Sequence, residues 1–378
     1  MYLWSKKFQA WFFPTQDTTE PETSLDQLPP ATTSQLRSAI QGLPSPSVHR
    51  DAVQNALTAA IALWQENPVL APNSLVVLGS PVEPMEAIFS DALDALKEQN
   101  PLPVRRLLVP RPPDFTTIAT KLAASIAEDA PDAPTSQEHP ELVVIPSLAE
   151  YFLRCIGGLA GIEYLRDTVL KKRSRFWLIG CNHWAWEYLG YVCQLKAFFE
   201  QTLSLPALTD SQIQEWLNSA STSVVKTRFI RSSFLPDNAL LEEQLAELER
   251  LYFQKLSDIS LGVSSVASEL WLRSLRYQAT DDSSGSLFQE SPTLPDLPAL
   301  TVSDRYLLHS LLLHEQMSLP ALALSLGELE NFIQPQVQVL RRSGLILQQQ
   351  QLLKVNPLHY PRLKVELERN NFLVGEGN

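Results

Sequence analysis

Apolar positions follow two periods along this chain, and the pattern predicts a parallel α/β domain. Residues 142–145 and 176–180 are continuous apolar runs, which are typical of strands buried on both faces. Between them, residues 148–173 carry apolar side chains at helical spacing. A strand, a crossover helix and a second strand form a βαβ unit, so both strands belong to one parallel sheet. Further strands are expected at 75–78 and 104–109.

Ligands of such sheets bind at the carboxyl ends of the strands. Gly79 follows the first predicted strand, Pro146 and Ser147 follow the third, and Asn182 follows the fourth. We expect these ends to meet at one edge, where a functional site would lie.

A strand, a turn that begins with glycine and a helix make the setting of a phosphate-binding loop, and Gly79 begins such a turn. A working loop needs glycine five residues later, then lysine, then serine or threonine. This chain has Pro84, which offers no N–H, then Met85, which has no charge, then Glu86, which is anionic.

The second half of the pocket shows a matching loss. A magnesium-binding carboxylate and a water-activating glutamate are expected after the strand 142–145, but Pro146 and Ser147 follow it. We therefore predict a degenerate pocket with no catalytic residue, metal or cofactor; the alternative is a βα turn that never bound nucleotide. The predicted pocket comprises Gly79, Ser80, Pro84, Met85, Glu86, Pro146, Ser147 and Asn182.

Three segments after the sheet resemble the AAA+ family. Asn182 stands where AAA+ ATPases carry a polar sensor residue, and residues 199–217 are similar to the segment that leads from the AAA+ core into its lid. Residues 259–275 resemble the lid helix of the initiator and signalling branches, with Arg273 or Arg276 near a second sensor position. The resemblance covers about 48–372 and implies a P-loop NTPase-like domain with a helical lid. Because the nucleotide-binding residues depart from the family, ATPase activity is not implied.

Composition and spacing divide the chain into six parts. These are an aromatic docking peptide (1–13), a flexible linker rich in Pro, Ser and Thr (14–47), the degenerate P-loop-like α/β domain (48–220), the helical lid (221–280), a second linker (281–300) and a winged-helix-like domain (301–378).

The first thirteen residues predict an amphipathic helix with an aromatic stripe. Trp4, Phe8, Trp11 and Phe12 share one face. We interpret the segment as a docking peptide for a protein partner or a membrane interface, and the alternative is that it packs on its own domain. The candidate docking residues are Trp4, Lys6, Lys7, Phe8, Trp11, Phe12 and Phe13.

The C-terminal module predicts a helix-turn-helix with a wing. Its helices are expected at 303–314, 318–324 and 328–343, and its wing at 345–355. Gln334, Gln338, Arg341 and Arg342 are the candidate contact residues of the third helix. Residues 301–378 hold seven Lys or Arg and seven Asp or Glu, so the module lacks the basic footprint of a DNA reader. A protein-contact role is favoured.

The composition of the whole chain also favours protein contact over nucleic-acid binding. A formal charge of −12 over 378 residues disfavours general affinity for nucleic acid. The chain has no apolar run of about 20 residues, so no spanning helix is expected. The three cysteines are typical of free thiols in a cytoplasmic protein. We predict a catalytically inactive AAA+-like pseudo-ATPase that acts as a cytoplasmic adaptor or scaffold, either free or peripheral to a membrane. The alternatives are a winged-helix DNA-binding regulator and a membrane-surface-associated regulator.

Overall fold

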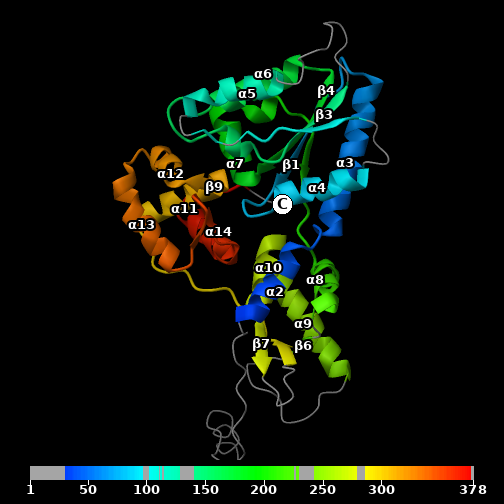
Figure 1. The fold of residues 1–378 in the computed structure, drawn as a ribbon, viewed down its shortest axis with the longest axis vertical. Coiled ribbons are helices and arrows are strands. Elements are labelled where there is room, and N and C mark those ends of the chain that lie inside the picture. Colours follow the sequence, from blue (N-terminus) through cyan, green and yellow to red (C-terminus); the bar gives the residue numbers. More distant parts are fainter. Residues whose placement is uncertain are drawn as a thin grey trace, which may run out of the picture.

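The computed structural model describes residues 30–96, 102–109, 111–112, 115–127, 140–224, 227–229, 242–278 and 286–375. Figure 1 shows three parts: an α/β core, a helical lid below it, and a C-terminal domain against the side of the core. The docking peptide 1–13 lies outside the described residues.

The core is a five-stranded parallel sheet, which confirms the predicted fold class. Its strands are β1 (Ser74–Gly79), β2 (Val104–Arg106), β3 (Glu141–Ile145), β4 (Arg175–Asn182) and β5 (Thr202–Ser204). Their order is β2-β3-β4-β1-β5, which is the order of the AAA+ core. All four neighbouring pairs are parallel.

Helices cover both faces of this sheet. On one face lie α3 (Ser47–Glu66) and α4 (Met85–Leu96), and on the other lie α5 (Ile118–Ala127), α6 (Ala160–Lys171) and α7 (His183–Cys193). Successive strand residues point to opposite faces, so each strand contributes to two cores. Both faces are therefore apolar, which is why the strands read as continuous apolar runs.

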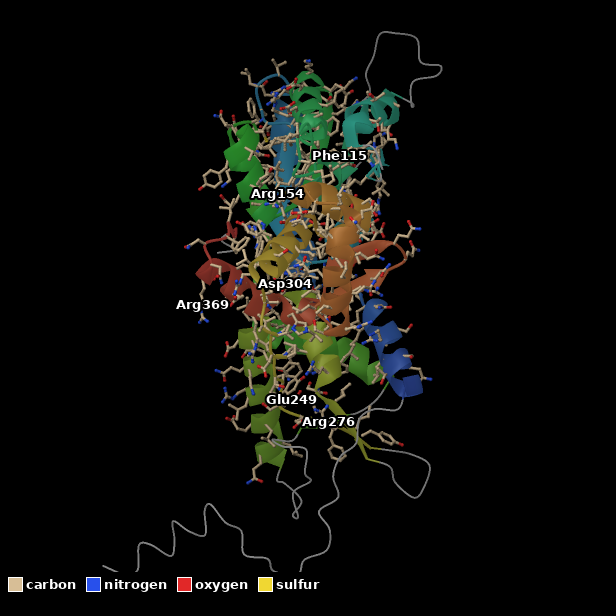
Figure 2. All side chains as sticks on the ribbon, turned by 90° about the vertical axis from the view of Figure 1, so that its left-hand side faces the viewer. Phe115, Arg154, Glu249, Arg276, Asp304 and Arg369 are labelled. Carbon is tan, nitrogen blue, oxygen red and sulfur yellow. The ribbon has the colours of Figure 1, made fainter. Side chains whose placement is uncertain are left out.

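The crossover before β4 differs from the predicted single helix over 148–173. It consists of the 3-10 turn Leu148–Tyr151, an irregular loop and then α6. Gly157 has φ +73°, a left-handed conformation that favours glycine and interrupts a helix. The loop leaves the Arg154 side chain at the boundary between the core and the C-terminal domain, where Figure 2 labels it.

The lid begins earlier than predicted. It consists of α8 (Asp210–Val224), α9 (Glu242–Ser260) and α10 (Ser264–Arg273), with a small sheet of β6 (Thr227–Phe229), β7 (Leu275–Gln278) and β8 (Ser286–Gln289). The sheet order is β6-β8-β7. Both predicted linkers therefore need correction, because β8 lies within 281–300 and a helix lies within 14–47. That helix, α2 (Pro30–Gln41), buries Leu36 in the core cluster that includes the lid.

The C-terminal domain has the predicted helix-turn-helix and wing. Its elements are α11 (Val302–His314), β9 (Gln316–Ser318), α12 (Leu319–Leu326), α13 (Glu330–Arg342), β10 (Ile346–Gln349), β11 (Leu352–Val355) and α14 (Tyr360–Arg369). The three strands form an antiparallel sheet in the order β10-β11-β9.

None of the helices described is long and apolar enough to cross a membrane. Within the same part of the chain, no group of three or more His, Cys, Asp or Glu side chains is arranged to hold a metal ion.

Candidate functional site at the carboxyl edge of the sheet

The structure brings the predicted pocket residues together at one edge of the sheet. Gly79 and Asn182 are register partners at the ends of β1 and β4. Pro146 and Ser147 directly follow β3, whose last residue, Ile145, pairs with Ile179 of β4. The strand ends therefore form a single site, as the βαβ pattern predicted.

The turn between β1 and α4 is closed by its own hydrogen bonds. The Glu83 N–H donates to the carbonyl of Ser80 over 3.0 Å, and the Met85 N–H donates to the carbonyl of Glu83 over 2.9 Å. A phosphate loop holds its ligand with backbone N–H groups of this kind. Here two of them are already used within the turn, and Pro84 has none.

Met85 occupies the interior of this turn. A Cβ atom placed on Gly79 would lie 2.7 Å from Met85 Cε, and one placed on Gly180 would lie 2.8 Å from Met85 Cγ. The Met85 side chain thus packs against the neighbouring strands β1 and β4 on one face of the sheet and is buried. The residue that stands at the lysine position of the predicted loop points into the core, while Pro84 and Glu86 are exposed.

Glu83 ties the turn to the lid. Its carboxylate accepts a 2.7 Å hydrogen bond from the Ser264 N–H, at the first residue of α10, and a second one from the Ser264 hydroxyl. A carboxylate at a helix N-terminus satisfies unpaired N–H groups and interacts favourably with the helix dipole. Sequence analysis missed this residue, because its partner is 181 positions away.

The C-terminal domain inserts a carboxylate between the other two strand ends. Glu315, between α11 and β9, accepts a 2.8 Å hydrogen bond from the Ser147 hydroxyl and a 3.1 Å bond from the Asn182 side-chain amide. The same amide also donates to the carbonyl of Leu313. Ser147 and Asn182, two polar residues of the predicted pocket, therefore both donate hydrogen bonds to the C-terminal domain. Glu315 adopts φ +61°, an uncommon conformation for a residue other than glycine.

Glu315 and Arg111 are opposite charges at this edge, and both side chains are half-buried. Burial raises the pKa of the Glu315 carboxyl, while the hydrogen bonds from Asn182 and Ser147 and the Arg111 charge act in the opposite direction. Arg111 donates to the carbonyl of Gln316 over 2.8 Å and to that of Ala149. Burial lowers the pKa of Arg111. A buried charge needs such partners, because an unpaired one is strongly destabilising.

Arg111 corrects one expectation from the sequence, which located no positive group at this edge. The residue lies in the connection between β2 and α5, and its sequence neighbours give no motif. Its backbone-directed hydrogen bonds show that it joins the C-terminal domain to the core.

Two hollows adjoin the site. A cleft of about 1480 Å³ lies between the core, the lid and the C-terminal domain and reaches Pro84, Glu86 and Ser147. A smaller cavity of about 250 Å³ lies beside Ser80 and is partly closed by Tyr360 and Lys364 of α14. The C-terminal domain therefore borders both hollows.

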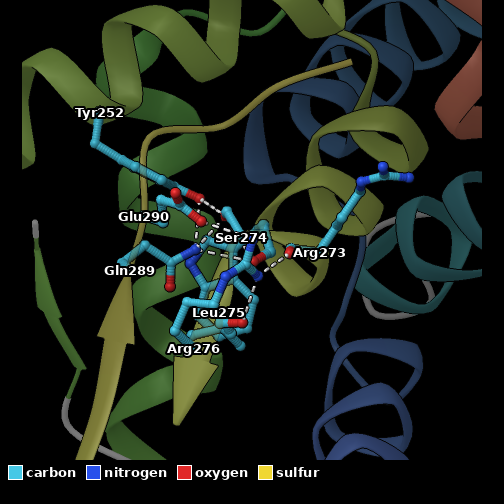
Figure 3. Close-up of polar contacts among 8 residues, drawn as sticks. Tyr252, Arg273, Ser274, Leu275, Arg276, Gln289 and Glu290 are labelled. Atoms are coloured by element: carbon cyan, nitrogen blue, oxygen red, sulfur yellow. Dashed lines mark hydrogen bonds and ion pairs between the residues drawn. The ribbon is translucent and has the colours of Figure 1, made fainter. Parts of the chain in front are cut away.

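Neither candidate for a second sensor lies in this cleft. Arg276 forms a 2.6 Å ion pair with Glu290 beside the small lid sheet. Figure 3 shows that pair beside the buried cluster of Tyr252, Ser274 and Gln289, with the Arg273 side chain extending away from it. Arg273 is exposed and is not part of the cleft lining.

The predicted contact residues of the third helix lie on α13. Gln334, Gln338 and Arg342 are exposed, and Arg341 donates to the side chain of Gln338 over 3.1 Å. Three apolar residues of the same region are also exposed, namely Leu329, Phe332 and Val339. Sequence analysis did not select these apolar residues, because exposure of a helix face depends on what packs against it.

Comparison with known proteins gives distant similarity in structure alone. No family profile and no curated protein sequence matches the chain. The ORC2 protein of Aeropyrum pernix in its ADP form aligns with a TM-score of 0.38 and 12% identity, covering 88% of this chain and 97% of that one. Cdc6p from Pyrobaculum aerophilum aligns with a TM-score of 0.36 and 12% identity, covering 93% and 100%. A RuvB mutant from Thermotoga maritima gives 0.34 and 15%, covering 83% and 94%.

Similarity at this level does not establish a function. The strand order and the sequence of core, lid and winged helix are observed in this chain itself. On those grounds the chain has an AAA+-like α/β core with a helical lid, followed by a small C-terminal domain of helices and an antiparallel sheet.

Proposed function

We propose that this protein is a non-hydrolysing AAA+-like scaffold that binds protein partners. The observation that supports this most directly is the position of Glu315, a half-buried carboxylate that accepts hydrogen bonds from Ser147 and Asn182 at the edge where a nucleotide and its metal would be held. A phosphate group at that place would meet this carboxylate, and the nearby cation, Arg111, already donates to the carbonyls of Gln316 and Ala149.

The turn after β1 supports the same proposal independently. Hydrolysis needs a cation against the β- and γ-phosphates and a carboxylate that positions the metal. Met85 fills the interior of the turn with an apolar side chain, and its own N–H is bonded to Glu83. Removing Glu315 alone would therefore not create an ATPase.

In place of a nucleotide, side chains join the three parts of the molecule. Glu83 links the core to α10 of the lid, and Glu315 and Arg111 link the core to the C-terminal domain. AAA+ machines move their lid when nucleotide binds; permanent side-chain links would hold one arrangement. A fixed arrangement suits a protein that presents surfaces to partners.

Partner binding is assigned to two regions, the aromatic segment 1–13 and the winged helix. The exposed part of α13 carries Phe332 and Val339 beside the polar Gln334 and Gln338. Exposed apolar side chains on a helix favour a protein contact over phosphate contacts, which need clustered basic residues.

The DNA-binding alternative has one observation in its favour. Arg342 is exposed at the end of α13, the helix that would enter the major groove in a helix-turn-helix reader. Steep salt dependence of binding to duplex DNA would support this second candidate, and binding that is weak and independent of sequence would not.

Calorimetry of the full chain with Mg-ATP tests the loss of nucleotide chemistry. We expect no binding heat at concentrations that would detect a Kd of about 100 μM, and no phosphate release. Glu315→Ala should behave in the same way, because Met85 and Pro84 remain. Micromolar binding with turnover in the unmodified chain would overturn the proposal.

Affinity purification tests the scaffold role. The intact chain should retain specific proteins at physiological salt, and a chain that lacks residues 1–13 should lose those held by the aromatic segment. The truncation ends before α2, because that helix packs on the lid and its removal would disturb the fold. Retention of nucleic acid alone would favour the DNA-binding regulator, and retention of anionic vesicles alone would favour the membrane-associated regulator.

A further inference from the structure

The third helix of the winged-helix domain presents an apolar stripe. Leu329 is 65% exposed, Phe332 is 67% exposed and Val339 is 63% exposed. Phe332 and Val339 are seven residues apart, so both lie on one side of α13, and Leu329 lies at its N-terminal end. Ile333, Val337 and Leu340 are buried on a different face of the helix, and this fixes which face is presented.

Polar contacts border this stripe on the side of α11. Gln336 donates to Asp304 over 2.8 Å and accepts from the Ser303 hydroxyl over 3.2 Å. Gln336 is thus used within the domain, whereas the stripe itself is left open by the described residues. An open stripe of large apolar side chains on a charged domain is typical of a contact surface.

The aromatic segment 1–13 matches this stripe in length and pattern. As a helix it would place Trp4, Phe8, Trp11 and Phe12 on one face. Both this segment and α13 have thirteen residues, which corresponds to about 20 Å of helix. At 1.5 Å per residue, the stripe from Trp4 to Phe12 spans about 12 Å and the stripe from Leu329 to Val339 about 15 Å, so the two can cover each other by side-chain packing.

Charge favours the same pairing. Lys6 and Lys7 are the only charged residues of the segment. The start of α13 carries two exposed carboxylates, Glu328 and Glu330, and its end carries Arg341 and Arg342. The lysines would therefore be attracted to the start of α13 and repelled by its end, which selects one orientation.

The connection is long enough. Residues 14–29 separate the segment from α2, and sixteen residues span at most about 54 Å. α2 contributes Arg37 and Gln41 to the large cleft, and the wing that follows α13 contributes Gln348 and Gln351 to the same cleft. Figures 1 and 2 both show α2 beside the lower end of the winged-helix domain.

We propose that the aromatic segment 1–13 packs on the stripe formed by Leu329, Phe332 and Val339 of the same chain. If the isolated segment bound the stripe with a Kd of about 0.1 mM, an effective concentration of about 1 mM for a short linker would make the packed state about tenfold more populated than the open one. The contact is independent of the nucleotide pocket, so its failure would leave the calorimetric result unchanged.

Photo-crosslinking of the full chain tests the contact. A benzoylphenylalanine placed at the position of Phe8 should crosslink to a peptide within residues 324–342, in a band with the mass of one chain. Phe332→Asp should abolish this crosslink. Leu63→Asp should leave it intact, because Leu63 is a comparably exposed apolar residue, at 52%, on α3 of the core.

Hydrogen exchange gives a second readout. Trp11→Asp should speed exchange in α13 by up to about tenfold relative to the unmodified chain. A crosslink to the same peptide at the mass of two chains would overturn the proposal in favour of a second copy. Crosslinks elsewhere, crosslinks that need anionic vesicles, or unchanged exchange would also overturn it.

Discussion

At the residue scale, Met85 decides what the turn after β1 can do. Its side chain lies between Gly79 and Gly180, beneath the backbone that would face a ligand. The sequence showed that methionine replaces a lysine of the expected motif. It did not show that the side chain turns inward and becomes part of the core cluster with Ile88 and Phe89.

Met85→Lys tests this position. We expect the lysine to destabilise the fold by about 2–5 kcal/mol, because an ammonium group would be buried without a partner, and we expect no gain of Mg-ATP binding. Chemical denaturation with calorimetry measures both effects. Met85→Leu is the matched control and should cost less than about 1.5 kcal/mol. A stable Met85→Lys variant that binds Mg-ATP at micromolar concentration would show that the turn can open.

The contribution of His309 to folding stability depends on pH. Its ring donates to the carbonyl of Leu373 over 2.9 Å and packs against Trp184 and Phe372. Burial lowers the pKa of His309 to about 4, below the ordinary value of 6.5. Below pH 6.5 the unfolded chain therefore binds a proton before the folded chain does, so stability falls as the pH falls toward 4.

His309→Gln should reduce this dependence. Glutamine keeps a donor for Leu373 and does not titrate, so the loss of about 1.4 kcal/mol per pH unit due to one proton should disappear between pH 6.5 and 4. Denaturation midpoints at several pH values measure the difference between the two proteins, and other titrating groups cancel. Parallel curves for both proteins below pH 6.5 would contradict the assignment.

At the element scale, helix α10 begins on a carboxylate from the core. Glu83 satisfies the N–H of Ser264, and Val263 before it supplies no side-chain cap. The helix thus depends on a residue of the turn after β1 for its N-terminal bond. This contact positions the lid against the turn after β1.

Glu83→Ala should destabilise the protein by about 1–2 kcal/mol, because α10 loses its capping carboxylate. Glu86→Ala is the matched control: it removes an exposed carboxylate three residues away, in the first turn of α4, and should change stability by less than about 1 kcal/mol. Thermal unfolding compares the two variants. Equal effects would mean that the Glu83 contact does not hold the lid.

Elements were predictable to different degrees from the pattern of residues. β1, β3 and β4 are central strands with long apolar runs, and their positions were correct within about two residues. The helix α2 was interpreted as linker, because seven of its twelve residues are Pro, Thr, Ser or Gln; in the structure it packs on the lid through Leu36. The helix predicted over 148–173 is shorter in the structure, where α6 begins at Ala160, because Gly157 in the crossover after β3 adopts a left-handed conformation.

At the scale of the whole molecule, Arg111 joins two domains. It donates to Ala149 of the core and to Gln316 of the C-terminal domain. We expect Arg111→Ala to remove both hydrogen bonds and the cation near Glu315, and to weaken domain docking by about 1.5–3 kcal/mol. Small-angle scattering and protease cleavage at residues 291–300 would report the released domain.

Arg37→Ala is the control for that experiment. Arg37 borders the same cleft, and its 3.9 Å ion pair with Glu269 is largely exposed, so its loss should cost less than about 1 kcal/mol. A compact Arg111→Ala protein, as resistant to protease as Arg37→Ala, would show that the docking does not depend on the buried charges.

The pattern of residues was enough to predict the parallel sheet and the helix-turn-helix with its wing, whereas the helical lid was expected only from the resemblance to AAA+ proteins. The identities of Pro84, Met85 and Ser147 at the strand ends could also be read directly. These features are local, because strand periodicity and residue type depend on neighbouring positions. The contact of Glu315 with Ser147 could be found only in the folded chain, because 168 residues separate them and no local pattern links them. For the same reason the open face of α13 became visible only once the domain was folded, since burial of a helix side depends on its distant neighbours.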